Sequence, residues 1–318
     1  MNSVKPDRLR PGDAVCIVSP GSPSLTPLNF DQGRTKLEHL GYRVVVSPHL
    51  NDRYLLFAGT EKARADDINN AFRDDSIRAI ICAQGGCGTS QVLPHLDFSL
   101  MAEHPKIFVG YSDITALQTA MLNKTGLVTF YGPMATTEFG KGLTAYTANS
   151  LLTLLTETAR TLELKNPPAK PGKEVLTLYP GTVRGQLTGG CLSIVAAGLG
   201  TDFEIDTKDK ILFFEDIDEK PHRIDRYLTQ LAMAGKFREV RGIIFGTFHR
   251  CEYYAGDPYF KFNVTVLDII KERILPLKIP VILGLQFGHV RNKLTLPVGG
   301  QAVLDATNRR IFVEPAVV

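Results

Sequence analysis

The chain has 318 residues, of which 44% are hydrophobic and 22% charged, and its formal net charge is +3. This composition is typical of a soluble globular protein of about two domains with ample apolar surface for a core. The small net charge and the lack of a Lys/Arg run argue against nucleic acid as the main partner. No apolar run approaches the roughly 18 residues that a membrane-spanning helix needs.

The N-terminal stretch and the cysteines bear on the compartment. MNSVKPDRLRPGDAVCIVSPGSP carries charges and prolines where a secretory signal needs a continuous apolar core. The cysteines are too few and too scattered for a disulfide framework, and none forms the C-x-x-C pair of a structural zinc site. We therefore expect a cytoplasmic protein with reduced thiols. The five are Cys16, Cys82, Cys87, Cys191 and Cys251.

Strand and helix patterns alternate over the first half of the chain. The expected strands are AVCIVSP (14–20), RVVVSP (43–48), AIICAQ (79–84), IFVG (107–110) and LVTFYG (127–132). The expected helices are LNFDQGRTKLEHLG (28–41), TEKARADDINNAFRD (60–74) and ITALQTAMLNKTG (114–126). This alternation predicts a doubly wound, flavodoxin-like domain over residues 1–150, with a parallel sheet covered on both faces.

A linker is expected at 151–182, because KNPPAKPGK (165–173) breaks all periodicity. Residues 183–318 then predict a mixed α/β domain. Its expected elements are Gly-rich turns in RGQLTGG (184–190), a helix at CLSIVAAGLG (191–200), strands at ILFFEDI (211–217), GIIFG (242–246) and PVILG (280–284), and a closing hairpin around Asn308.

A serine lies in the corner between an expected strand and helix, in the stretch GYSD (110–113). One interpretation is that Ser112 or Asp113 caps the following helix, since such side chains accept its first free N–H groups. The other is that Ser112 is a nucleophile presented by the strand-to-helix turn. The stretch alone favours the cap, because capping serines are far commoner than catalytic ones.

A second polar loop, AQGGCGTSQVLPHLD (83–97), follows another strand of the same predicted sheet, and ligands gather at that sheet edge. The motif is weak by itself: it lacks the lysine of a P-loop and does not match the dinucleotide fingerprint. Beside Ser112 it suggests an oxyanion hole, with the backbone N–H groups of Gly86 and Asp113 as the donors.

A serine nucleophile needs a base and an acid to orient that base. The strand KILFFEDIDE (210–219) ends in Glu215, Asp216 and Asp218, and periodicity does not choose among these carboxylates. His289 follows a buried run in a Gly-flanked turn, GLQFGH (284–289). Each residue by itself is more often a surface residue than a catalytic one. The order of nucleophile, acid and base is that of α/β-hydrolases, and the site would lie in a cleft between domains.

Six blocks follow one another along the chain: GGCGTSQVLPHLDF, GYSDITAL, GPM, GQLTGGCLSIVAAGLGT, LFFEDIDE and GLQFGH. In order and spacing they resemble the LD-carboxypeptidases, a serine peptidase family that also contains the microcin-immunity hydrolases. The match runs from about residue 11 to about residue 315. The resemblance implies a Ser112–His289–Glu215 triad, an oxyanion hole near Gly86 and Asp113, and frequently a homodimer. It also implies that no metal or other cofactor is needed. The implied reaction removes the terminal D-alanine from muropeptide tetrapeptides during cytoplasmic murein recycling.

Three positions depart from the family pattern, and they concern the substrate more than the reaction. Cys87 stands where a bulky residue is frequent, Tyr131 where His is frequent, and Cys191 where Asn is frequent. The chain has no Trp, whereas the microcin-immunity branch tends to carry one over the substrate, so the muropeptide branch is favoured. Neither Arg223 nor Arg291 is singled out as the cation for the substrate carboxylate.

Three alternatives stay open. The chain could be a microcin-immunity-like hydrolase of peptide–nucleotide amides. It could use Cys87 as the nucleophile, since this thiol lies in a Gly-rich turn after a strand. It could also be a non-catalytic, two-lobed binder of a small ligand, although a binder would not need Ser112, Glu215 and His289 together.

Overall fold

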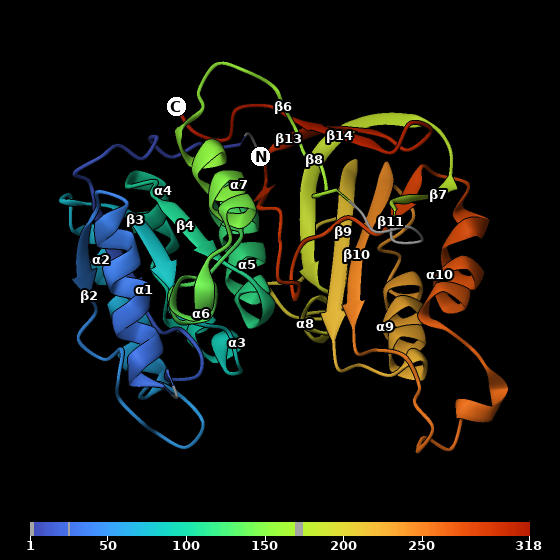
Figure 1. Cartoon of the computed structure of the whole chain (residues 1–318), viewed down its shortest axis with the longest axis horizontal. Coiled ribbons are helices and arrows are strands. Elements are labelled where there is room, and N and C mark those ends of the chain that lie inside the picture. The colour runs from blue at the N-terminus through green and yellow to red at the C-terminus, as the bar shows by residue number, and fades with distance from the viewer. Residues whose placement is uncertain (1–2, 25, 169–173) are drawn as a thin grey trace.

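Two β-sheets organise the chain, one in each of two lobes that stand side by side in Figure 1. The structure is a computed structural model that describes residues 3–24, 26–168 and 174–318. None of the helices in those ranges is both long and apolar enough to span a bilayer. The second half of the expected proline-rich stretch, residues 169–173, lies outside the described residues.

The N-terminal sheet has the strand order β12-β5-β4-β3-β1-β2. Strands β1 to β5 are parallel, and β12 pairs antiparallel to β5 at the edge. The order 2-1-3-4-5 is that of flavodoxin-like folds, so this prediction is confirmed. The strands are β1 (Ala14–Val18), β2 (Arg43–Val46), β3 (Ile77–Cys82), β4 (Ile107–Gly110), β5 (Thr129–Tyr131) and β12 (Leu296–Val298).

The helices of this lobe follow the strands as their patterns predict. Thr60 caps α2 by accepting the N–H of Ala63, and Ile68 and Phe72 face the core. Gly126, with a φ of +75°, ends α5 in the left-handed conformation that suits glycine. The helices are α1 (Pro27–His39), α2 (Glu61–Arg73), α3 (Thr89–Val92), α4 (Phe98–Glu103), α5 (Thr115–Thr125), α6 (Gly140–Gly142) and α7 (Ala145–Thr156), with short turns η1 (Leu93–His95), η2 (Ser112–Ile114) and η3 (Ala135–Phe139).

The C-terminal sheet has the order β6-β14-β13-β8-β9-β10-β11-β7. Its centre, β8 to β11, is parallel, and its flanking strands are antiparallel. The strands are β6 (Leu162–Glu163), β7 (Leu176–Tyr179), β8 (Thr182–Cys191), β9 (Lys210–Ile217), β10 (Gly242–His249), β11 (Val281–Leu283), β13 (Gln301–Asp305) and β14 (Arg310–Val313). The helices are α8 (Leu192–Ala197), α9 (Pro221–Met233) and α10 (Val266–Ile274), with turns η4 (Phe260–Phe262) and η5 (Leu275–Leu277).

The two faces of β9 belong to different cores. Ile211 and Phe213 pack in the large core that is continuous with the N-terminal lobe, whereas Leu212 and Phe214 pack beneath α8, α9 and α10. Because successive side chains of a strand point to opposite faces, Glu215 continues the first row and Asp216 the second. The strand therefore directs one carboxylate toward the other lobe and buries its neighbour on the far side.

One sequence prediction is wrong: RGQLTGG forms no turns but most of the central strand β8. Its glycines serve close packing, because a Cβ on Gly189 would lie 1.9 Å from the backbone oxygen of Phe213. The hairpin around Asn308 is confirmed by the antiparallel pairing of β13 with β14.

The expected domain limits stay a prediction, but strand pairing differs from them in two ways. The presumed linker contributes β6 and β7 to the C-terminal sheet, and the last third of the chain returns β12 to the N-terminal sheet. Helix α7 also continues past residue 150. Such crossings arise because a strand can pair its backbone N–H and C=O groups with any free sheet edge beside it, whatever the position of the strand in the chain.

Candidate active site

Ser112 stands at the carboxyl end of β4 in a strained backbone conformation. Its φ is +66°, a left-handed value that costs a residue with a side chain about 1–2 kcal/mol. Two contacts hold it there: its N–H donates to the Tyr131 hydroxyl (3.2 Å), and its carbonyl accepts the Thr115 hydroxyl (2.7 Å). Strain that is held by such contacts is characteristic of functional sites.

The capping interpretation of this corner is wrong for both residues. No side chain caps η2 or α5. The carboxylate of Asp113 instead accepts the N–H of Thr89, the first residue of α3, at 2.9 Å. Burial raises the pKa of Asp113, while the bonds from Thr89 oppose that rise. Asp113 therefore ties the glycine-rich loop to the Ser112 turn.

The structure brings Ser112, His289 and Glu215 together from two lobes. His289 Nε2 lies 3.1 Å from Ser112 Oγ, and His289 Nδ1 lies 2.8 Å from Glu215 Oε2. An ionised carboxylate can only accept hydrogen bonds, so Nδ1 carries the hydrogen and Nε2 is left to accept the Ser112 hydroxyl. The orientation of the imidazole is that of a base directed at a hydroxyl.

Glu215 has no exposed surface and accepts three hydrogen bonds. Besides the imidazole, it receives the backbone N–H of His289 (3.1 Å) and the Tyr131 hydroxyl (2.6 Å). Gly288 makes this approach possible: its φ is +74°, and a Cβ there would lie 2.1 Å from Glu215 Cδ. Of the three carboxylates left open by the sequence, Glu215 is the one that reaches His289.

Asp216 faces the opposite side and anchors the start of α8. It accepts the backbone N–H of Ser193 (2.7 Å) and the Cys191 thiol (3.3 Å). Burial raises the pKa of Asp216 to about 6. Asp218 is exposed at the surface and pairs with Arg250.

The glycine-rich loop lies against the Ser112 turn. A Cβ on Gly85 would lie 3.1 Å from Ser112 Cβ and 3.2 Å from the backbone nitrogen of Asp113. Gly86 has a φ of +87°, and a Cβ there would lie 2.3 Å from Ser22 Oγ. The loop therefore brings the backbone of Gly85 beside the turn that carries Ser112 and Asp113, while the next residue, Gly86, packs against Ser22.

Cys87 lies in this loop, and in the described part of the chain its hydrogen-bond partner is the hydroxyl of Ser22. Its Sγ is 3.6 Å from Ser22 Oγ, a hydroxyl that cannot take a proton from a thiol at neutral pH. The buried Arg64 also stabilises this loop, because its guanidinium donates hydrogen bonds to the carbonyl of Gly88 (2.8 Å) and to the side chain of Gln91 (2.8 Å). Cys87 thus belongs to the loop that flanks Ser112.

Tyr131 is the site residue whose contacts the sequence did not reveal. Its ring is fully buried, and its hydroxyl bridges the backbone of Ser112 and the carboxylate of Glu215. Burial and the adjacent carboxylate raise the pKa of Tyr131 well above its usual value, so the phenol keeps its proton. The feature that could have pointed to this role is the position of Tyr131 at the end of β5, where it pairs with Gly110 of β4, two residues before Ser112.

A buried ion pair supports the other side of the imidazole. Lys293 Nζ lies 2.5 Å from Glu138 Oε1 and 3.8 Å from the centre of the Tyr111 ring, which packs edge-on against His289 at 5.1 Å. Burial lowers the pKa of Lys293, while Glu138 opposes this effect. Nothing in the sequence pattern distinguished this lysine from a surface residue.

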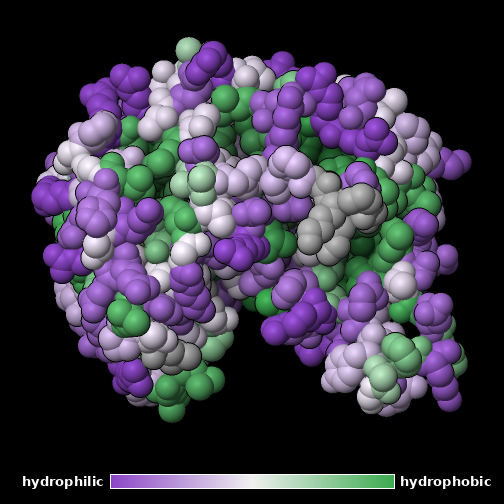
Figure 2. All heavy atoms as spheres, viewed as in Figure 1, coloured by the Kyte–Doolittle hydropathy of each residue, from purple (hydrophilic) through white to green (hydrophobic). Residues whose placement is uncertain are grey.

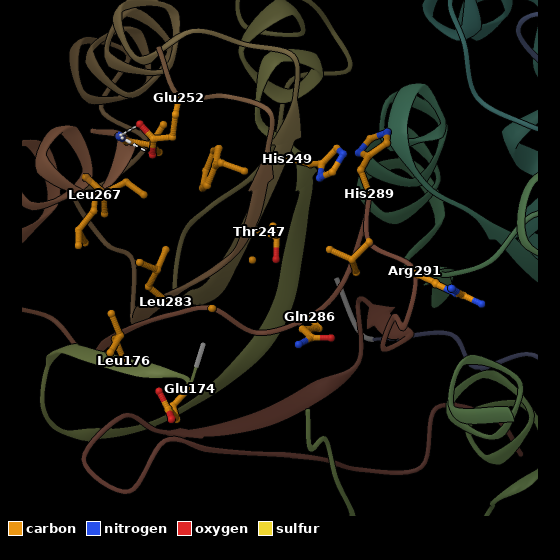
Figure 3. A pocket seen from close by; sticks show the side chains of 16 residues that line it. Glu174, Leu176, Thr247, His249, Glu252, Leu267, Leu283, Gln286, His289 and Arg291 are labelled. Atoms are coloured by element: carbon orange, nitrogen blue, oxygen red, sulfur yellow. Dashed lines mark hydrogen bonds between the residues drawn. The ribbon is translucent and has the colours of Figure 1, made fainter. Parts of the chain in front are cut away.

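The surface is hollowed between the two lobes (Figure 2). A cavity of about 730 Å³ begins at His289 and extends along β10, β11 and α10. Figure 3 shows His249 beside His289 at one end, and Leu176, Leu267 and Leu283 farther along, while the side chain of Arg291 points away from the cavity.

Comparison with known protein families shows the family to which this chain belongs. The family model of the LD-carboxypeptidase N-terminal domain matches residues 15–132, and that of the LD-carboxypeptidase C-terminal domain matches residues 184–304. The chain belongs to the LD-carboxypeptidase family. It is a serine-type carboxypeptidase, as members of this family are.

Relatives cover almost the whole chain. The probable murein peptide carboxypeptidase of Bacillus subtilis is 38% identical over 98% of this chain and 95% of its own length. Among solved structures, muramoyltetrapeptide carboxypeptidase from Oxalobacter formigenes is 30% identical, with a TM-score of 0.82 over 94% of this chain and 97% of that one. The microcin C7 self-immunity protein MccF is 26% identical, with a TM-score of 0.90 over 99% and 100% of the two chains.

Proposed function

We propose that this LD-carboxypeptidase removes the terminal D-alanine from muropeptide tetrapeptides, with Ser112 as nucleophile, His289 as base and Glu215 as the acid that orients it. The observation that carries the proposal is the continuous chain of contacts from Ser112 Oγ through the imidazole to Glu215 (3.1 and 2.8 Å). A non-catalytic binder has no need of this alignment.

In the proposed mechanism, His289 Nε2 takes the proton from Ser112 as Oγ attacks the scissile carbonyl carbon. Glu215 stabilises the imidazolium, and the backbone N–H groups of Gly86 and Asp113 stabilise the oxyanion. Collapse of this intermediate breaks the C–N bond, and His289 gives its proton to the departing amine of D-alanine. Water then hydrolyses the acyl-serine by the same route in reverse.

Two observations favour a muropeptide over other substrates. The relative with 38% identity is named a probable murein peptide carboxypeptidase, and a solved relative is named muramoyltetrapeptide carboxypeptidase. The chain also has no Trp, whereas the microcin-immunity branch tends to carry one over its substrate. Because these fragments arise when murein is recycled, the proposal places the enzyme in cytoplasmic murein recycling.

A second candidate follows from the likeness to MccF, of which one solved structure holds aspartyl sulfamoyl adenosine. If this chain shares that specificity, it cleaves aminoacyl–nucleotide amides instead of muropeptides. The two candidates use the same three side chains and differ only in the group that fills the cleft.

The test is incubation with L-Ala-D-Glu-diaminopimelate-D-Ala and, separately, with an aspartyl–adenylate amide that contains a cleavable bond. We expect free D-alanine from the parent protein and none from Ser112→Ala. Release from the amide alone would favour the MccF-like substrate, and equal D-alanine release by both proteins would exclude Ser112 as nucleophile. A thiol reagent tests the remaining alternative. If alkylation of Cys87 abolished turnover while the Ser112→Ala variant stayed active, the nucleophile would be Cys87.

A further inference from the structure

We propose that Lys293 is a positioning residue for the reaction: by pairing with Glu138, it fixes the loop that carries His289 to the N-terminal lobe. The imidazole is thereby kept in line with Ser112. This inference rests on the proposed function, since it concerns the base of the proposed triad. The ion pair differs from one that only stabilises the fold, because it holds the loop of the base and, through Tyr111, contacts the imidazole itself.

The base lies on a loop that crosses from one lobe to the other. Residues 284–295 connect β11 of the C-terminal sheet with β12 of the N-terminal sheet, and His289 is near their middle. The N–H of Leu294 donates to the carbonyl of Gln286 at 2.7 Å, which closes a compact loop around His289. Lys293 lies on the same closed loop, so an attachment at Lys293 restricts the movement of the imidazole.

Catalysis depends on where this loop stands relative to each lobe. His289 Nε2 contacts Ser112 of the N-terminal lobe, whereas Nδ1 contacts Glu215 of the C-terminal lobe. A misplacement of about 1 Å in an active site can lower the rate by about 100-fold, so both ends of the loop have to be fixed. Asn166, which follows β6, provides one attachment through two hydrogen bonds of 2.8 Å to the first residues of the loop.

Lys293 provides the attachment to the N-terminal lobe. Its side chain is 1% exposed, Nζ lies 2.5 Å from Glu138 Oε1, and its backbone N–H donates to the Thr147 hydroxyl of α7 at 3.0 Å. Glu138 is itself held, because Oε2 accepts the N–H of Met134 (3.1 Å) and the hydroxyl of Thr137 (2.7 Å). Charge-assisted hydrogen bonds of this kind are short and strong, so the ammonium is fixed by an acceptor that is fixed in turn.

Tyr111 connects this attachment to the imidazole. It precedes Ser112 in the chain, and its hydroxyl donates to Glu138 Oε1 at 3.0 Å. Lys293 Nζ lies 3.8 Å from the centre of the Tyr111 ring, and this ring packs edge-on against His289 with 5.1 Å between the ring centres. The ring therefore contacts both the ammonium and the base, and displacement of the ammonium would loosen one wall around the imidazole.

The double variant Lys293→Met/Glu138→Gln tests this role, because it removes the ion pair without leaving a buried charge. The measurement is release of D-alanine from L-Ala-D-Glu-diaminopimelate-D-Ala. We expect the double variant to be more stable than Lys293→Met alone, yet to keep a kcat at least about 10-fold below that of the parent, with KM changed by less than about 2-fold. If the pair only stabilised the fold, kcat would recover together with stability.

Two further variants complete the comparison. Tyr111→Leu should lower kcat to a similar extent, because the imidazole loses the same wall while the ion pair stays. Lys106→Met is the matched control, since Lys106 is another buried lysine (6% exposed), at the opposite end of β4 from Ser112. Its ammonium bonds to the carbonyls of Ala71 and Asp74, so this variant should lower Tm and leave kcat unchanged.

The tautomer of His289 gives a readout that does not depend on the substrate. Nitrogen NMR of the histidine side chains, assigned with His289→Gln, should show the hydrogen on Nδ1 alone in the parent and a mixture of tautomers in Lys293→Met/Glu138→Gln. If the parent released no D-alanine but this change of tautomer occurred, the proposed function would fall and the positioning role would stand. A folded double variant that keeps both the parental kcat and the single tautomer would overturn the positioning role alone.

Discussion

Tyr131 donates its phenolic hydrogen to Glu215 Oε1 at 2.6 Å and so occupies the carboxylate oxygen that His289 does not use. The same hydroxyl accepts the N–H of Ser112 at 3.2 Å. One side chain of the N-terminal sheet therefore contacts both the proposed nucleophile and the proposed acid, which belong to different lobes.

Tyr131→Phe should lower kcat/KM by about 10–100-fold, because it removes a hydrogen bond to a charged group worth about 1.5–3 kcal/mol. The loss should fall on kcat, since Tyr131 is buried behind the site. Steady-state kinetics test this. Tyr146→Phe, which removes a hydroxyl bonded to the carbonyl of Lys165, is the control and should retain full activity.

Gly288→Ala should abolish turnover and destabilise the protein. Its Cβ would overlap Glu215 Cδ at 2.1 Å, so the carboxylate would have to leave His289. Gly200→Ala is the matched control: φ there is +81°, with nothing within 4 Å of the added Cβ. Activity and Tm of the two variants separate displacement of Glu215 from backbone strain, and an active Gly288→Ala enzyme would contradict the assigned geometry.

Ser112→Gly should be more stable than Ser112→Ala by about 1 kcal/mol, although both should be inactive. Both variants lose the hydroxyl, but only glycine relieves the left-handed φ of +66°. Urea denaturation measures the difference. Equal stability of the two variants would indicate that this conformation carries no strain.

Lys293→Met should destabilise the protein by about 3–5 kcal/mol, because it leaves the Glu138 carboxylate buried without its partner. Addition of Glu138→Gln should recover part of this loss. The exposed pair Lys62–Asp66 provides the comparison, since Lys62→Met should cost less than about 1 kcal/mol. Urea denaturation of the four proteins tests whether the buried pair behaves differently from the surface pair.

Asp216 should make stability fall as pH rises from about 4 to 6. Its pKa is raised from 3.8 to about 6 in the folded protein, so the folded state binds more protons than the unfolded state in this window. Linkage then predicts a loss of up to about 3 kcal/mol that is complete above the folded pKa. The free energy of unfolding of Asp216→Asn should show a correspondingly smaller decrease between pH 4 and pH 7; identical pH profiles would refute the shifted pKa.

The sequence by itself predicted the flavodoxin-like lobe, because strands buried on both faces read as continuous apolar runs and the helices between them show their own period. The prediction of turns at RGQLTGG was wrong. Gly189 of β8 is required by the close approach of the Phe213 backbone on the neighbouring strand, which a local sequence pattern does not reveal. The sequence also placed Ser112 and His289 at the ends of strands, where ligands of α/β sheets gather.

Only the tertiary structure decided which groups meet. Glu215 and Asp216 are adjacent in sequence and chemically alike, and the pleat of β9 alone sends the first to His289 and the second to Ser193. Tyr131 and Lys293 gained their roles in the same way, from burial beside distant residues. Contacts across 84 or 177 positions of chain depend on how the lobes pack, which no local pattern encodes.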